Sequence, residues 1–171
     1  KDPAGLALTE QTAYETYGAS GTYLRRLSRT LPAGNQWTYA YYGATEEVDS
    51  PCSGGAPDIN HGGMLKTRTG PDPDNAAGGQ TPRIEEFVYD SAGRILASRV
   101  NSGSWKCLTY NTRGRITTSV VPAFGAQTSD RTVTYDHAVD DNPLVTSVSD
   151  LKGTITTTVD LLGRVISYTD V

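Results

Sequence analysis

Aromatic and aliphatic residues alternate with polar residues over short stretches of this chain, and turn-forming residues interrupt them about every 10 to 12 positions. In residues 37–41, with the sequence WTYAY, alternation places Trp37, Tyr39 and Tyr41 on one face of a strand. The 18 Gly and 9 Pro leave few windows in which a helix could run uninterrupted. The pattern therefore predicts an all-β chain of repeated antiparallel hairpins.

One turn phrase occurs several times. Residues 89–95 read YDSAGRI, residues 110–116 read YNTRGRI, and residues 159–165 read VDLLGRV. Weaker copies start at Tyr17 and at Tyr135, where the turn is enlarged and has no Gly. The starts at 89, 110, 135 and 159 are separated by 21, 25 and 24 residues, so the phrase is a repeat of roughly constant length.

The residue types of this phrase predict a tight hairpin turn. An Asp or Asn can accept hydrogen bonds from backbone N–H groups two residues on, and a Gly three positions later adopts positive φ without a Cβ clash. This combination is typical of a type I turn closed by a bulge, with the aromatic before the turn facing the aliphatic residue after it. The residues expected to build these turns are Tyr89, Asp90, Gly93, Arg94, Tyr110, Asn111, Gly114, Arg115, Asp160, Gly163 and Arg164.

These phrases, alternating with small turns such as DLKGTITT, resemble the YD or RHS repeats of bacterial Rhs and toxin-complex proteins and of animal teneurins. The resemblance covers residues 84–171 well and residues 1–42 weakly. It implies a long antiparallel sheet of hairpins that curves into a hollow shell. In Rhs and toxin-complex proteins such shells enclose a C-terminal toxin, whereas in teneurins they support cell adhesion.

The length fits one YD-repeat module over residues 1–171, and two features depart from the family pattern. Residues 43–83 hold 13 of the 27 Gly and Pro and have no YD phrase, which predicts a long loop insertion around one short strand, GGMLKTRT. Five or six turns are also too few for a closed shell. We therefore expect a curved open sheet, a segment of a longer protein, whose exposed edges favour self-association.

The charge balance limits the classes of partner. The formal net charge is -4 and the isoelectric point is near 5.1, without a cluster of Lys and Arg, which argues against nucleic acid. No apolar run approaches the roughly 18 residues of a membrane helix, so we expect no membrane insertion. The first residues have no apolar signal core, and any export signal is expected to lie outside this stretch.

The two cysteines, Cys52 and Cys107, have neither the doublet spacing nor the histidines of a zinc site. A disulfide between them is the simplest pairing, and two unrelated thiols are the alternative. A bridge would indicate an oxidising compartment, which favours a secreted or cell-surface protein.

The residues that could carry catalysis are scarce. His61 and His137 are the only histidines, and neither lies in a nucleophile or metal-ligand motif, so both are expected to be loop residues. The carboxylate pairs at 46–47, 85–86 and 140–141 are adjacent in sequence, and on a strand such neighbours face opposite ways. Oxygen-rich stretches at 72–75 and 136–142 do not match the twelve-residue calcium loop. We expect neither an enzyme nor a metal or other cofactor.

These observations leave two functional hypotheses. The first is a non-enzymatic shell or scaffold segment whose partner is the rest of its own polypeptide, a cargo or toxin domain that it encloses or presents. The alternative is an adhesin that binds a glycan or protein through Trp37, Tyr39 and Tyr41, if those rings are exposed.

Overall fold

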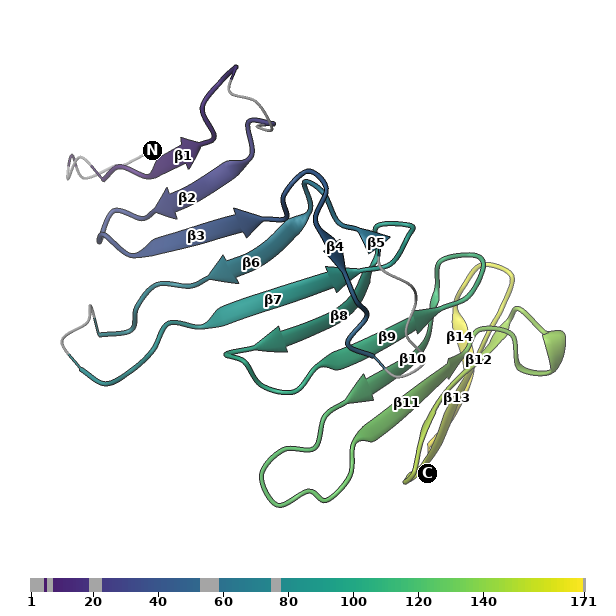
Figure 1. Cartoon of the computed structure of the whole chain (residues 1–171). Coiled ribbons are helices and arrows are strands. Elements are labelled where there is room, and N and C mark those ends of the chain that lie inside the picture. Colours follow the sequence, from purple (N-terminus) through teal and green to yellow (C-terminus); the bar gives the residue numbers. More distant parts are fainter. Residues whose placement is uncertain (1–4, 6–7, 19–22, 53–58, 75–77, 171) are drawn as a thin grey trace. The chain divides into compact units, whose positions relative to one another are not determined.

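The computed structural model describes residues 5, 8–18, 23–52, 59–74 and 78–170, and it confirms the predicted antiparallel all-β fold (Figure 1). One short 3-10 turn, η1 (Val139–Asp141), follows β11. The strands are β1 (Gln11–Tyr14), β2 (Arg26–Thr30), β3 (Gln36–Tyr41), β4 (Glu47–Val48), β5 (Ile59–Asn60), β6 (Leu65–Thr69), β7 (Ile84–Tyr89), β8 (Ile95–Val100), β9 (Lys106–Tyr110), β10 (Ile116–Val121), β11 (Arg131–Asp136), β12 (Val145–Asp150), β13 (Gly153–Val159) and β14 (Val165–Thr169).

Twelve strands form one hydrogen-bonded sheet in which each strand pairs with the next along the chain, except that β3 pairs with β6. The predicted strand within GGMLKTRT is thus β6, and it belongs to the main sheet. Strands β4 and β5 form a separate two-stranded ribbon. The strand order starts at β1 and ends at β14, so the described strands do not close into a barrel.

The chain divides into two compact units, Lys1–Ser104 with β1–β8 and Trp105–Val171 with β9–β14. In the first unit, Tyr39 lies opposite Arg68 and Tyr41 opposite Leu65. Because alternate residues of a strand share a face, these registers define an aromatic face and a hydroxyl face. The aromatic face carries Tyr14, Trp37, Tyr39, Tyr41, Phe87 and Tyr89, and the hydroxyl face carries Ser28, Thr30, Thr38, Thr67 and Thr69.

The second unit has the same division between its faces. On its hydroxyl face, one residue from each of five successive strands lies in a row: Thr109, Thr118, Thr134, Ser149 and Thr154. The Thr109 and Thr118 hydroxyl oxygens are 2.6 Å apart and share a hydrogen bond. The opposite face carries Leu108, Val133, Tyr135, Val148 and Ile155. Large apolar side chains are therefore concentrated mostly on one side of the sheet in each unit, although Val88 and its partner Ala97 lie on the hydroxyl face of the first unit.

Few side chains are fully buried, because a single sheet exposes both of its faces. Among the residues that the structure describes, the buried apolar side chains are Tyr42, Val88 and Ala97, and the buried polar ones are His61 and Ser119. Four of these five lie in the first unit. Its core is therefore found where Tyr42 and His61, at the two ends of residues 43–62, lie against β7.

Candidate functional site

The repeated phrase closes the β7–β8 hairpin as a tight turn with a network of backbone hydrogen bonds. The Asp90 N–H donates to the Arg94 carbonyl and the Gly93 N–H donates to the Asp90 carbonyl, both at 2.9 Å. Asp90 Oδ1 accepts the N–H groups of Ala92 and Arg94, each at 2.9 Å. Gly93 has φ of 77°, the left-handed region that favours glycine. The polar groups of the phrase are therefore hydrogen-bonded within its own turn.

The other two strong copies have the same geometry. Asn111 Oδ1 accepts the N–H groups of Arg113 and Arg115, and Asp160 Oδ1 accepts those of Leu162 and Arg164. Gly114 and Gly163 also have φ of 77°. The register pairs Tyr89 with Ile95, Tyr110 with Ile116 and Val159 with Val165, and each pair is followed by a β-bulge. The three turns are one structural unit.

Ion pairs support two of the three turns. The Arg94 guanidinium lies 2.6 Å from Asp90 Oδ2, and that of Arg164 lies 2.7 Å from Asp160 Oδ2. Burial raises the pKa of Asp90, but hydrogen bonds from Arg94 and the backbone outweigh it, so this pKa lies below its ordinary value. The Arg164 and Leu162 N–H groups and the Arg164 side chain lower the pKa of Asp160. Arg115 has no equivalent pair, because Asn111 is neutral.

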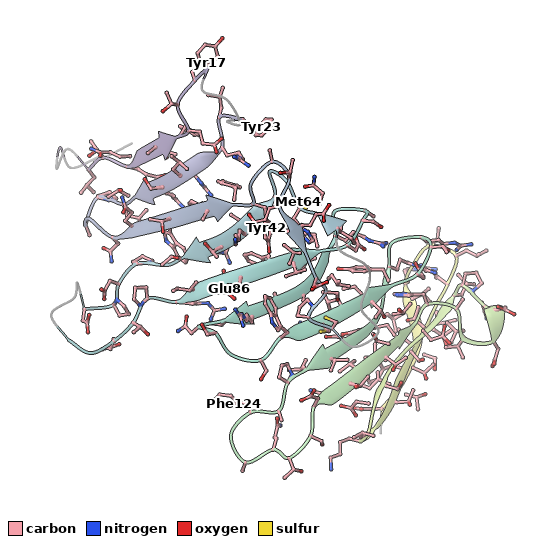
Figure 2. The ribbon with its side chains drawn as sticks, in the orientation of Figure 1. Tyr17, Tyr23, Tyr42, Met64, Glu86 and Phe124 are labelled. Carbon is pink, nitrogen blue, oxygen red and sulfur yellow. The ribbon has the colours of Figure 1, made fainter. Side chains whose placement is uncertain are left out.

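Two further hairpins contain the same turn in a form that the sequence pattern does not reveal. In β1–β2, the Glu15 N–H donates to the Arg25 carbonyl and Leu24 has φ of 57°, so Tyr14, Glu15 and Leu24 occupy the Tyr, Asp and Gly positions. The weak copy predicted at Tyr17 was therefore placed three residues too late. Tyr17 is a loop residue, 86% exposed, which projects away from the strands, and residues 19–22 of that phrase lie outside the described residues (Figure 2).

In β3–β6, the Tyr42 N–H donates to the Met64 carbonyl and the Gly63 N–H donates to the Tyr42 carbonyl. Gly63 has φ of 83°, and Tyr41 lies opposite Leu65. This is again the repeated turn, with Tyr42 in place of Asp. Residues 43–62, which we call the insertion, stand where the β7–β8 turn has only Ser91 and Ala92. The structure thus locates an insertion within the stretch 43–83.

The insertion is held on β7 by buried polar side chains from its two ends. The Tyr42 hydroxyl donates to the Phe87 carbonyl at 2.6 Å, and burial raises the pKa of Tyr42 to about 12. The ring of His61, only 1% exposed, lies between those of Tyr42 and Tyr89, with centroid distances of 5.0 Å and 5.9 Å. His61 thus lies outside the strands, as predicted, but its side chain is buried.

Both ring nitrogens of His61 are used. The Tyr89 N–H donates to Nε2 at 2.9 Å, and Nδ1 lies 2.5 Å from the Ile59 carbonyl, to which it can donate. Nε2 also lies 3.0 Å from the Tyr89 carbonyl oxygen, so both ring nitrogens contact main-chain groups. His61 therefore satisfies the β7 backbone at the point where β6 no longer pairs with it. This is a structural role, and the sequence offered no signal for it.

The disulfide between Cys52 and Cys107 is confirmed, since both cysteines of the chain are disulfide-bonded. Cys52 lies within the insertion and Cys107 lies in β9. The Cys52 sulfur is 3.8 Å from the carbonyl oxygen of Leu96 in β8. The insertion is therefore fixed by a covalent bond as well as by its buried ends. The bond is compatible with an extracellular location.

The predicted ligand-stacking residues Trp37, Tyr39 and Tyr41 share the aromatic face and are half-buried. Each ring has a guanidinium group near it. The guanidinium carbon lies 5.7 Å from the ring centroid for Arg68 and Trp37, 4.3 Å for Arg26 and Tyr39, and 4.5 Å for Arg25 and Tyr41. Such contacts are favourable cation–π interactions. A sugar ring stacking on this face would compete with these arginines.

Carboxylates hold two of these arginines, Arg25 and Arg68, in place. Glu15 binds Arg25 through its side chain, with a shortest distance of 2.5 Å, and also accepts the Tyr23 and Arg25 N–H groups. The bond from Arg25 is the main cause that lowers the pKa of Glu15 to about 2, although burial opposes it. Arg29 pairs with Glu10, and Arg68 pairs with Glu85. The charges on this face are thus largely paired within the chain.

The other candidate residues lie apart from one another. His137 contacts a backbone group: its Nε2 lies 2.7 Å from the Ile116 carbonyl oxygen. Within the described ranges, no group of three or more His, Cys, Asp or Glu is placed to hold a metal ion. Asn75, part of one oxygen-rich stretch, lies outside those ranges. No helix in the described chain is long and apolar enough to cross a membrane.

Comparison with known proteins adds no relative: no family model matches the chain, and a search of curated proteins finds no match.

Proposed function

We propose that this chain is a non-enzymatic structural segment of a YD-repeat shell or scaffold, part of a large secreted or surface bacterial protein that encloses or presents a cargo or toxin domain. The observation that carries the proposal is the common geometry of the turns at Asp90, Asn111 and Asp160. In each turn, the Asp or Asn side chain accepts hydrogen bonds from the backbone of the same turn, which is a structural role.

The division between faces supports a wall rather than a free-standing domain. In each unit, one face is aromatic and aliphatic while the other is dominated by Thr and Ser. Large apolar side chains such as Ile95 and Val100 remain more than a third exposed on the aromatic face of the first unit. A sheet with one apolar face gains stability when that face is covered. In the proposal, cargo or further shell covers it.

Protease protection in the full polypeptide that contains this segment tests the proposal. We expect the cargo region to resist cleavage while the shell is intact, and to become sensitive in a variant that weakens three turns together, Gly93→Ala, Gly114→Ala and Gly163→Ala. The purified cargo region alone, cleaved under the same conditions, is the control. A cargo region that is cleaved equally fast in the parent polypeptide and alone would contradict enclosure.

The alternative is a glycan- or protein-binding adhesin that uses the aromatic face, and the observation that favours it is the row formed by Trp37, Tyr39 and Tyr41. It is less well supported because guanidinium groups already lie near these rings. A glycan array compares the parent with Trp37→Ala and with Phe124→Ala, a loop aromatic that is 88% exposed outside the row (Figure 2). Binding lost only in Trp37→Ala would support the adhesin.

A further inference from the structure

The turn between β13 and β14 carries an exposed apolar pair that its geometry does not require. Leu161 is 90% exposed and Leu162 is 78% exposed. The same positions of the other two strong copies hold small or polar residues, namely Ser91, Ala92, Thr112 and Arg113. All three turns are closed by the same backbone hydrogen bonds, so the turn does not need its leucines. We call Leu161 and Leu162 the leucine knob.

At the β12–β13 turn of the same unit, the apolar face of the sheet is hollowed. The hollow has a volume of about 200 Å³, and its apolar lining residues are Val133, Val148 and Ile155, from three neighbouring strands. Val148 is 39% exposed, so the lining is open to solvent. The Arg131–Asp150 ion pair, 2.6 Å long, also borders the hollow. A cavity of roughly 150 Å³ holds a benzene ring, so this hollow has room for a leucine side chain.

One copy of the chain cannot place its leucine knob in its own hollow. Ile155, near the start of β13, lines the hollow, whereas the knob follows Val159, the last residue of that strand. β13 has 7 residues. At about 3.3 Å per residue, an extended strand of that length spans roughly 20 Å. Only another molecule can therefore bring a knob and this hollow together, and a second copy supplies both.

We infer that the leucine knob of one copy binds in the hollow of a second copy. Burial of the leucines against Val133, Val148 and Ile155 removes apolar surface of both partners from water. The contact is heterologous, because each copy contributes a different surface to it. Copies therefore join head to tail rather than as two-fold pairs. This association goes beyond the proposed scaffold, because it joins separate polypeptides.

Sedimentation velocity of this chain at rising concentration tests the inference. Two leucines make a small interface, so the measurement extends to about 1 mM, where weak contacts form. We expect the average mass of the parent to rise with concentration without levelling off at a dimer. The knob variant, Leu161→Ser with Leu162→Ser, should associate at least about ten-fold more weakly. Tyr17→Ser, which changes a side chain 86% exposed in the first unit, is the control and should behave like the parent.

Blocking the hollow should have the same effect as removing the knob. Val148→Glu places a carboxylate among the apolar lining residues, while Arg131 and Lys152 at the hollow can balance its charge. Its melting temperature checks that the chain stays folded. An equimolar mixture of Val148→Glu and the knob variant should form dimers but nothing larger, because each such pair has one intact knob and one intact hollow.

Several results would overturn the inference. One is a parent that stays monomeric up to about 1 mM. Another is a knob variant that associates like the parent, and this variant should stay folded because its leucines are exposed. Undiminished association of Val148→Glu would mean that the knob binds elsewhere, and a mixture that stays monomeric would exclude the pairing of knob and hollow. None of these outcomes affects the scaffold proposal, which is tested by protease protection of the cargo.

Discussion

Replacing His61 with alanine is the most direct test of how the insertion is held. The ring is 1% exposed, and His61→Ala removes the partner of the Tyr89 N–H and that of the Ile59 carbonyl. Leaving a buried polar group unpaired costs about 1–3 kcal/mol. Two such groups, with the lost packing between Tyr42 and Tyr89, give an expected destabilisation of about 3–5 kcal/mol.

Thermal unfolding and hydrogen exchange together measure this cost. For a chain of this size, about 1 kcal/mol lowers the melting temperature by roughly 2–4 °C, so His61→Ala should lower it by at least about 6 °C. If the insertion opens without the sheet, the cost appears instead as faster exchange of the Tyr89 amide. Either result shows that His61 holds the insertion on β7.

His137→Ala is the matched control, because this second histidine is half-buried and has one hydrogen bond, to the Ile116 carbonyl. Its expected cost is about 1 kcal/mol. His61→Gln should recover part of the loss, since its amide oxygen can accept the Tyr89 N–H. If both alanine variants had equal small effects in both assays, the reasoning about His61 would be wrong.

Two further predictions concern the repeated turns. Gly163→Ala should cost about 1–2 kcal/mol through backbone strain alone, since Gly163 has φ of 77° and nothing lies within 4 Å of an added Cβ; Gly79→Ala, equally open but without positive φ, should leave the melting temperature nearly unchanged. The pKa of Glu15 is lowered from 4.5 to about 2, so its pair with Arg25 contributes stability above about pH 4.5 that is lost as the pH falls towards 2. The difference in melting temperature between the parent and Glu15→Gln should shrink over that range, and a constant difference would contradict the assignment.

The sequence by itself determined the local elements of this protein. Asp90 and Gly93 dictate a tight turn wherever their phrase occurs, because both the side-chain acceptor and the positive φ are properties of residues four positions apart or less. Regular turns then force consecutive strands into antiparallel pairs, so the all-β sheet followed from spacing alone. The strand within GGMLKTRT was predictable for the same reason.

The turns at Glu15 and Tyr42 escaped prediction because their backbone geometry is the same while the residues that form it differ. Leu24 adopts the position that glycine usually occupies, and the twenty residues of the insertion separate Tyr42 from Gly63. A sequence motif with fixed residue types and fixed spacing cannot detect either the replaced glycine or the inserted residues. The hydrogen bonds between the ends of the turn, which the fold brings together, reveal both.

Only the tertiary structure decided which residues lie inside. Alternation placed Trp37, Tyr39 and Tyr41 on one face, but arginines from neighbouring strands lie near those rings, and their approach depends on register. The burial of His61 depends on an insertion that folds back onto a strand 28 residues away along the chain. Local sequence fixes turns and strands because their interactions join near neighbours. Burial and pairing join distant residues, and only the folded chain brings these together.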